Sequence, residues 1–119
     1  MRPEYYRVTR VTIDGGREVC VRLAGDFDHD ACGDLERELT GAVLGTAAPL
    51  FVADLGETKF LGSEAVGVLL SGLLRAREHG KQVSIVNAHG VVRTVLVVTG
   101  ILDLFGDAED GPPVGLVAQ

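Results

Sequence analysis

Two short segments hold the side chains with the most chemical capacity. The first is residues 26–30, where His29 stands among three aspartates: Asp26, Asp28 and Asp30. The second is centred on Ser63, which directly precedes an apolar repeat with helical spacing. Crowded carboxylates favour a surface for a partner or an ion. A serine at a helix start either caps the helix or carries a phosphate, because helix N-termini stabilise anions.

The same residues do not form an enzyme signature. Asp28, His29 and Ser63 include the residue types of a hydrolase triad, but no G-x-S-x-G elbow surrounds the serine. The chain also lacks a glycine-rich phosphate loop with lysine and a G-x-G-x-x-G turn. Cys20 and Cys32 have no second cysteine pair that would complete a zinc site, so we expect plainly packed thiols. The sequence therefore predicts a non-enzyme without catalytic residues, metal or cofactor.

Composition limits the class of protein and the partners it can bind. The 119 residues suit one domain, and 46% hydrophobic with 24% charged residues is typical of a globular chain. A net charge of −6 without a basic run disfavours nucleic acids and anionic membranes. The start, residues 1–4, has no apolar signal segment, and no apolar stretch approaches the ~18 residues of a membrane span. We expect a cytoplasmic protein with reduced thiols.

The pattern before Ser63 predicts three strands and a helix. Alternating apolar residues indicate strands over 5–13 and 17–24, joined by a tight hairpin at the two glycines of Asp14–Gly16. Residues 25–30 read as a polar turn in which Asp28 or Asp30 caps a helix that ends near Leu44. The apolar run 50–55 indicates a strand covered on both faces, followed by a loop over 56–62.

From Ser63 onward the pattern becomes helical. Apolar residues fall on one helix face up to the stop at His79 and Gly80; they are Val66, Leu69, Leu70, Leu73 and Leu74. A strand follows over 81–86, then a helix over 90–100 and a short strand over 101–105. Strands alternating with helices predict an α/β sheet. We expect a domain over residues 1–106 and an acidic tail over 107–119 that contains glycine and proline.

Three motifs in order resemble STAS domains. The strand that ends Gly25-Asp26-Phe27-Asp28-His29 resembles their opening strand and G-E-L-D turn. Asp54-Leu55, Phe60-Leu61-Gly62-Ser63 and Gly67-Val68-Leu69-Leu70 resemble their central D-S-S-G-L segment and the next helix. Thr99-Gly100-Ile101 with Leu104-Phe105 resembles their closing S-G-L stretch. The resemblance covers about residues 8–106 and implies a single STAS-like α/β domain, with a central mixed β-sheet of about four to five strands and helices packed against it.

Within this family the chain is similar to bacterial anti-sigma factor antagonists. The resemblance implies binding to an anti-sigma factor that is itself a serine kinase using ATP, which frees the sigma factor. Phosphorylation at the position of Ser63 would end the binding, and a metal-dependent serine phosphatase would reset the protein. The acidic residue that the family has beside its phosphorylation site corresponds to Asp28.

The sequence departs from the family pattern around the serine. Gly62 stands where the family has aspartate, Glu64 where it has a second serine, and Ala65 where it has glycine. These departures point to a poorer kinase substrate or to a different partner. Glu64 also places a fixed negative charge beside Ser63.

Small residues extend the expected contact surface along the helix. Ser63, Gly67 and Ser71 recur at i, i+4 and i+8, on one side of a helix that a partner's backbone can approach closely. The alternative is that Gly67 packs inside the fold. The expected partner-binding residues are Asp26, Asp28, His29, Gly62, Ser63, Glu64, Gly67 and Ser71.

A second function competes with the phosphorylation switch. The alternative is a STAS subunit of a larger signalling or lipid-transport assembly that has no switch. Treatment with a cognate kinase and ATP distinguishes the two hypotheses. A small hydrolase ranks far below both.

Overall fold

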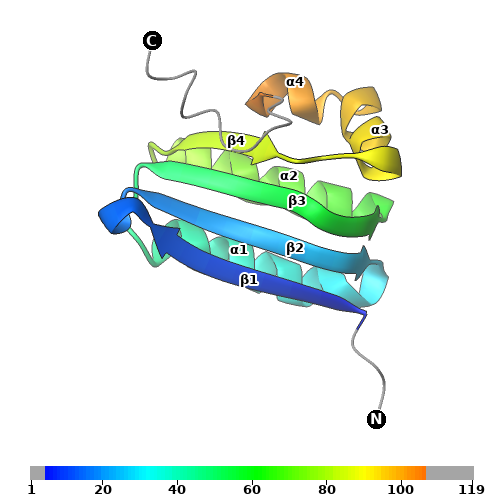
Figure 1. The fold of residues 1–119 in the computed structure, drawn as a ribbon, viewed down its shortest axis with the longest axis horizontal. Coiled ribbons are helices and arrows are strands. Elements are labelled where there is room, and N and C mark those ends of the chain that lie inside the picture. Colours follow the sequence, from blue (N-terminus) through cyan, green and yellow to red (C-terminus); the bar gives the residue numbers. More distant parts are fainter. Residues whose placement is uncertain (1–4, 107–119) are drawn as a thin grey trace.

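The computed structural model describes residues 5–106 and shows one four-stranded sheet in the order β1-β2-β3-β4 (Figure 1). The strands are β1 (Tyr6–Ile13), β2 (Glu18–Phe27), β3 (Leu50–Leu61) and β4 (Gln82–Val86). β1 runs antiparallel to β2, while β2, β3 and β4 run parallel. The expected α/β class and mixed sheet are therefore confirmed, at the lower end of the expected strand number.

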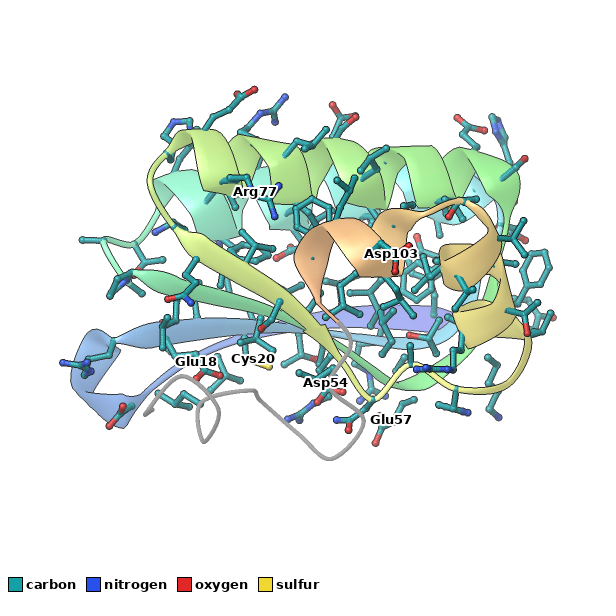
Figure 2. The ribbon with its side chains drawn as sticks, turned by 90° about the horizontal axis from the view of Figure 1, so that it is seen from above. Glu18, Cys20, Asp54, Glu57, Arg77 and Asp103 are labelled. Carbon is teal, nitrogen blue, oxygen red and sulfur yellow. The ribbon has the colours of Figure 1, made fainter. Side chains whose placement is uncertain are left out.

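Two long helices cover one face of this sheet. They are α1 (Cys32–Leu44) and α2 (Ser63–Glu78), which lie side by side behind the strands in Figure 1 and on one side of them in Figure 2. Alternation along β2 turns Val19, Val21 and Leu23 toward them, and all three are fully buried. The shorter helices α3 (Gly90–Val98) and α4 (Ile101–Phe105) lie beside β4 and complete the same core.

The hairpin between β1 and β2 and the burial of the two cysteines match the predictions from sequence. The β1–β2 connection is a short 3₁₀ turn at Asp14–Gly16. Its three residues have φ of 56°, 64° and 89°, a left-handed path that glycine adopts without steric cost. Cys20 and Cys32 are buried free thiols, as the sequence indicated.

The predicted ends of β2 and β3 were wrong. Residues 25–27 of the expected turn and residues 56–61 of the expected loop are strand, and Phe27 pairs with Leu61 at the end of the parallel ladder. The ladder between β2 and β3 continues through these residues with two register shifts, one between Arg22 and Ala24 and one between Gly25 and Asp26. Thr58 is buried there and its hydroxyl donates to the Leu23 carbonyl at 2.7 Å.

The last element is also corrected. Residues 101–105 form helix α4 and not the expected short strand, whereas the helix predicted over 90–100 is confirmed as α3. Gly100, with φ of 80°, ends α3 and redirects the chain. The apolar residues of α4 then enter the core, where the Arg77 guanidinium carbon lies 4.4 Å from the centre of the Phe105 ring. Apolar content alone did not distinguish a strand from a short buried helix.

Two further sequence predictions concern the limits of the chain. Over residues 5–106, no helix combines the length and the apolar character needed to span a membrane. The acidic tail over 107–119 lies outside the described residues, so its division from a 1–106 domain stays a prediction.

Candidate functional site

The parallel pairing of β2 with β3 brings the two chemically interesting segments together. Asp26 pairs with Phe60 and Phe27 with Leu61, so both strands end at the same edge of the sheet. The Gly62 amide then donates to the Phe27 carbonyl at 2.9 Å. The turn after β2 and the start of α2 are consequently neighbours, although more than thirty residues separate them in sequence.

Ser63 is the first residue of α2 and its side chain is exposed. We expected it to cap the helix, and that was wrong: the N-cap is Gly62, with extended backbone, and no side chain caps this end. The Gly62 carbonyl accepts the Val66 amide at 2.9 Å, so helical geometry begins with Ser63 itself. The Ser63 hydroxyl therefore stands at the exposed, positive end of a sixteen-residue helix.

The acidic segment forms a 3₁₀ turn, η2 (His29–Ala31), between β2 and α1. Asp28 is exposed and caps this turn by accepting the Asp30 amide at 3.1 Å. The expectation that Asp28 or Asp30 caps the following helix needs correction, because the N-cap of α1 is Ala31, without a side-chain bond. Asp26 stays within β2, half-buried.

His29 and Glu64 link the two segments, a contact that sequence reasoning did not identify. The His29 Nδ1 atom contacts the Glu64 carboxylate, and both side chains are exposed. Hydrogen bonding to Glu64 and its negative charge raise the pKa of His29, as do Asp30 and Asp28 to a smaller extent. These contacts favour the protonated form of the imidazole, which lies among the carboxylates of Asp28, Asp30 and Glu64.

The small residues of α2 lie on its exposed side. Ser63, Gly67 and Ser71 are all exposed, and a Cβ added at Gly67 would meet no atom within 4 Å. The reading of Gly67 as a core glycine is therefore excluded. In contrast, Gly72 on the same helix is buried against Leu39 of α1.

Two exposed apolar side chains border this surface and were missed. Phe60 is 47% exposed, and its ring lies 3.4 Å from where a Cβ on Gly62 would stand. Leu74, which was expected on the apolar face of the helix, is instead exposed on α2, one turn beyond Leu70 and Ser71. Exposed apolar patches mark protein-binding surfaces, and aromatic residues such as Phe60 are enriched there. If residues 56–62 had been interpreted as a strand, the alternation of side chains would have placed Phe60 and the buried Leu61 on opposite faces of the sheet.

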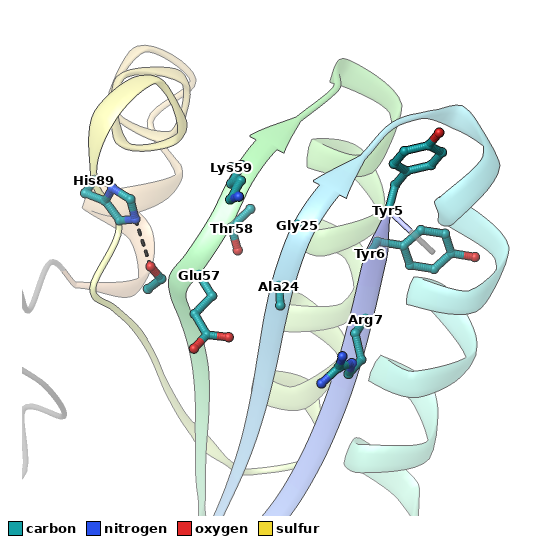
Figure 3. A pocket seen from close by; sticks show the side chains of 10 residues that line it. Tyr5, Tyr6, Arg7, Ala24, Gly25, Glu57, Thr58, Lys59 and His89 are labelled. Atoms are coloured by element: carbon teal, nitrogen blue, oxygen red, sulfur yellow. Dashed lines mark hydrogen bonds between the residues drawn. The ribbon is translucent and has the colours of Figure 1, made fainter. Parts of the chain in front are cut away.

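A metal site and a binding groove are two other candidate functional sites, and in the described residues neither contributes to the expected partner-binding surface. Within 5–106, no group of three or more His, Cys, Asp or Glu side chains is arranged to hold a metal ion. A groove of about 560 Å³ lies on the sheet face away from α1 and α2, bordered by Tyr5, Arg7, Lys59 and His89 (Figure 3). Its charges are mixed, because Glu57 also lines it, and none of the expected partner-binding residues does.

Solved structures with this fold include anti-sigma factor antagonists. One from Mycobacterium paratuberculosis is 21% identical and has a TM-score of 0.75, with 94% of this chain and 93% of that chain covered. SpoIIAA in its unphosphorylated form is 20% identical, with a TM-score of 0.76 and coverage of 94% and 96%. A single-residue variant of RsbS from Moorella thermoacetica is 22% identical, with a TM-score of 0.71 and coverage of 94% and 93%. At these identities the likeness establishes a common fold.

Comparison with curated protein sequences gave no match. A family model described as "Mlab, STAS domain" matches residues 11–106. This match begins within β1 and includes the other three strands and both long helices, and with them Ser63 at the start of α2. Because it spans most of the chain, the protein belongs to the STAS domain family.

Proposed function

We propose that the protein is an anti-sigma factor antagonist, which binds an anti-sigma factor of the ATP-using serine kinase type and thereby releases a sigma factor. The observation that carries the proposal is the exposed Ser63 at the first residue of α2, beside the acidic turn at Asp28 and His29. The similarity in fold to SpoIIAA and to the Mycobacterium antagonist supports it. The protein itself performs no reaction in this role.

The proposed contact surface follows the exposed side of α2 and the turn before α1. It comprises Asp26, Asp28, His29, Gly62, Ser63, Glu64, Gly67 and Ser71, to which the structure adds Phe60 and Leu74 as apolar neighbours. Small side chains let a partner backbone approach α2 closely, while the apolar pair supplies area that can be buried. Charged groups around them favour one orientation of the partner.

Phosphorylation of Ser63 is the proposed off-switch. A phosphate adds about −1.5 to −2 charges at pH 7, and a helix N-terminus accepts that charge without unfolding. Asp28 and Glu64 already place negative charge around Ser63, and Glu64 also contacts His29, whose pKa it raises. The phosphate therefore acts at the interface, through repulsion, bulk and the cost of desolvating a doubly charged group. A metal-dependent serine phosphatase restores the binding form.

Capture and phosphorylation test this function directly. The full chain is immobilised, its partner is captured from the native cell, and the complex is incubated with ATP. The proposal expects a partner with an ATP-binding kinase domain and a gain of one phosphate in intact mass. Ser63→Ala should abolish the gain. Ser71→Ala, which removes the other exposed serine of the same helix face, should leave it unchanged. A phosphate that persists in Ser63→Ala would refute the assignment.

A second function is favoured by the family description, which names an Mlab STAS domain, and by Glu64 beside Ser63. In this case the protein is a constitutive STAS subunit of a larger signalling or lipid-transport assembly. Partner binding would then be unchanged by ATP treatment and equal for Ser63→Ala and Ser63→Asp. Dissociation on phosphorylation would exclude the subunit role.

A further inference from the structure

The groove on the face of the sheet away from α1 and α2 brings together charged side chains from separate segments (Figure 3). Arg7 comes from β1, whereas Glu57 and Lys59 come from β3. His89 follows β4, and the ring of Tyr5 stands at the start of β1. All five side chains are exposed. The volume of about 560 Å³ falls within the range of small-molecule sites, about 300–1,000 Å³.

One row of the sheet places opposite charges on the two sides of this groove. Arg7 of β1 pairs with Ala24 of β2, and Ala24 pairs with Glu57 of β3. Neighbouring strands lie about 4.8 Å apart, so the Arg7 and Glu57 backbones are about 10 Å apart, with only the small side chain of Ala24 between them. Over residues 5–106 neither Arg7 nor Glu57 forms an ion pair.

The next row on the same face is arranged differently. Thr9 pairs with Arg22 and Arg22 with Asp54, so the opposite charges of this row stand on adjacent strands. The Arg22 Nε atom lies 3.4 Å from the Asp54 carboxylate, and the two form an ion pair. These charges satisfy each other. Those of Arg7 and Glu57, one strand further apart, stay available for a ligand between them.

The side of the groove next to Glu57 is held in place by hydrogen bonds. The Gly56 amide donates to the Asp54 carboxylate at 2.9 Å, and the His89 Nε2 atom donates to the Gly56 carbonyl at 2.9 Å (Figure 3). The same Asp54 oxygen accepts from the Asn87 side chain at 3.1 Å, which ties the segment after β4 to β3. Both backbone groups of Gly56 are therefore fixed before a ligand arrives, and this lowers the cost of ordering the site on binding.

The floor of the groove is free of large side chains. Ala24 and Gly25 of β2 lie there. Gly25 has φ of 97°, and a Cβ at this position would stand 2.1 Å from the Tyr5 carbonyl oxygen, so β1 approaches too closely for any side chain. A ligand can consequently lie flat on β2 and reach Arg7 at one end and Glu57 at the other.

We propose that this groove binds a small zwitterion in which an ammonium and a carboxylate are separated by several bonds, as in a short peptide or an ω-amino acid. The carboxylate faces Arg7, the ammonium faces Glu57, and the Tyr5 ring covers the apolar stem between them. A simple cation would meet Arg7 and Lys59, and a simple anion would meet Glu57. A molecule that presents both charges therefore complements the groove better than either.

This site is independent of the proposed function. None of the expected partner-binding residues lines the groove, and Ser63 begins a helix on the other side of the sheet. Loss of zwitterion binding would accordingly leave the antagonist proposal untouched, and the reverse also holds.

Three ligands of similar shape test whether both charges are required. 6-Aminohexanoate carries an ammonium and a carboxylate, hexanoate lacks the ammonium, and hexylammonium lacks the carboxylate. In amide NMR titrations of the full chain, 6-aminohexanoate should give saturable shifts at Ala24 and Glu57 and none along α2. The two singly charged ligands should bind at least about tenfold more weakly, since each leaves one charge of the groove without a partner.

Removing the two charges separately should change the ligand preference in opposite ways. Arg7→Gln should lower the affinity for 6-aminohexanoate to that for hexylammonium, and Glu57→Gln should lower it to that for hexanoate. Arg10→Gln is the control on β1, because the Arg10 guanidinium lies beside Gly41 of α1. Glu36→Gln is the control for the lost carboxylate, since Glu36 is exposed on α1. Both controls should keep the parent affinity.

The same titrations can overturn the proposal. It fails if 6-aminohexanoate gives no saturable shift by about 10 mM. It fails equally if hexanoate or hexylammonium binds as tightly as 6-aminohexanoate, because the groove would then recognise a single charge. Parent affinity in both Arg7→Gln and Glu57→Gln, with normal circular dichroism spectra, would place the zwitterion elsewhere on the molecule.

Discussion

The negative charge of Glu64, the residue after Ser63, should affect how tightly a partner binds the proposed contact surface. We expect Glu64→Ser to tighten binding to a kinase-type anti-sigma factor, because it removes a fixed negative charge that partly imitates phosphorylation. Ser63→Asp should weaken binding. For the phosphorylated form we expect a loss of about 3 kcal/mol in binding free energy, which corresponds to a roughly hundredfold increase in Kd. Isothermal titration calorimetry measures both affinities, with far-UV circular dichroism to confirm the fold.

His29→Ala separates charge from local structure in that experiment. It removes the same His29–Glu64 contact as Glu64→Ser does, but leaves the carboxylate in place and unpaired with His29. If charge decides affinity, His29→Ala should weaken binding while Glu64→Ser tightens it. Equal affinities for all variants and the parent, with folds intact, would mean that the start of α2 is not the contact site.

The His29–Glu64 contact also predicts a pH dependence. Glu64 raises the pKa of His29 above its ordinary 6.5 in the folded protein. The pair therefore contributes stability fully below about pH 6.5, and this contribution is lost as the pH rises through the folded pKa. We expect Glu64→Gln to lower the free energy of unfolding at about pH 5.5 and to have no effect through this pair at about pH 9.

Nuclear magnetic resonance of the imidazole checks the cause. The pKa of His29 should lie above 6.5 in the parent and fall toward that value in Glu64→Gln. High salt should reduce the difference, because both side chains are exposed and screened. A parent pKa at or below 6.5 would show that the contact does not persist in solution.

Helix α2 has two glycines whose surroundings differ, which allows a matched comparison. A side chain at Gly67 enters open space, so Gly67→Leu should block the approach of a partner and weaken binding. Its stability should stay near that of the parent or rise by up to about 1 kcal/mol, since glycine is a poor helix former. Calorimetry with the captured partner and thermal unfolding measure the two effects; unfolding of the variant would contradict the exposed position.

Gly72→Ala is the counterpart inside the fold. A Cβ at Gly72 would approach the Leu39 side chain to 2.8 Å, where α1 and α2 pack together. We expect a loss of about 1–3 kcal/mol in the free energy of unfolding from overpacking, measured by urea denaturation. Affinity per folded molecule should be unchanged, because Gly72 is buried away from the proposed surface.

The periodicity of the sequence was sufficient to predict some helices and strands, but it did not predict where every strand ends. The 3.6-residue repeat of α2 and the alternation of β2 depend on burial along one face, and both were predicted. The ends of β2 and β3 depend on pairing between Asp26 and Phe60, residues distant in sequence, and on two register shifts in the same ladder. Local composition does not contain that information, so these strand ends were predicted as loops.

For the whole molecule, α3 should unfold together with the sheet and the long helices. Leu96 of α3 is fully buried in the core shared with α1 and α2. Leu96→Ala should cost about 2–5 kcal/mol, with one cooperative transition in urea. Val98→Ala is the matched control, since Val98 is 79% exposed on the same helix and should change stability by less than about 0.5 kcal/mol. Two separate transitions would show that α3 is an independent unit.

The sequence predicted which residues belong to the candidate site better than it predicted how those residues are arranged. The residue types at 26–30 and around Ser63 were evident from the amino-acid sequence, and the resemblance to STAS domains connected them. The His29–Glu64 contact and the exposed Phe60 were not, because both depend on how the ends of β2 and β3 lie against each other. The backbone position of Ser63 likewise depends on where α2 begins, directly after the Gly62 cap.

The order of strands has a consequence for how the chain acquires its structure during synthesis. The β1–β2 pairing closes a short hairpin, whereas the parallel pairings of β2 with β3 and of β3 with β4 join residues thirty-two positions apart, Glu18 with Leu50 and Leu50 with Gln82. We therefore expect the hairpin to form early and the two parallel pairings, which close longer loops, to form more slowly. All residues of the surface around Ser63 lie before β4, in β2, η2, the end of β3 and α2. A nascent chain emerging from the ribosome therefore releases the recognition surface first, and α3 and α4 join it afterwards.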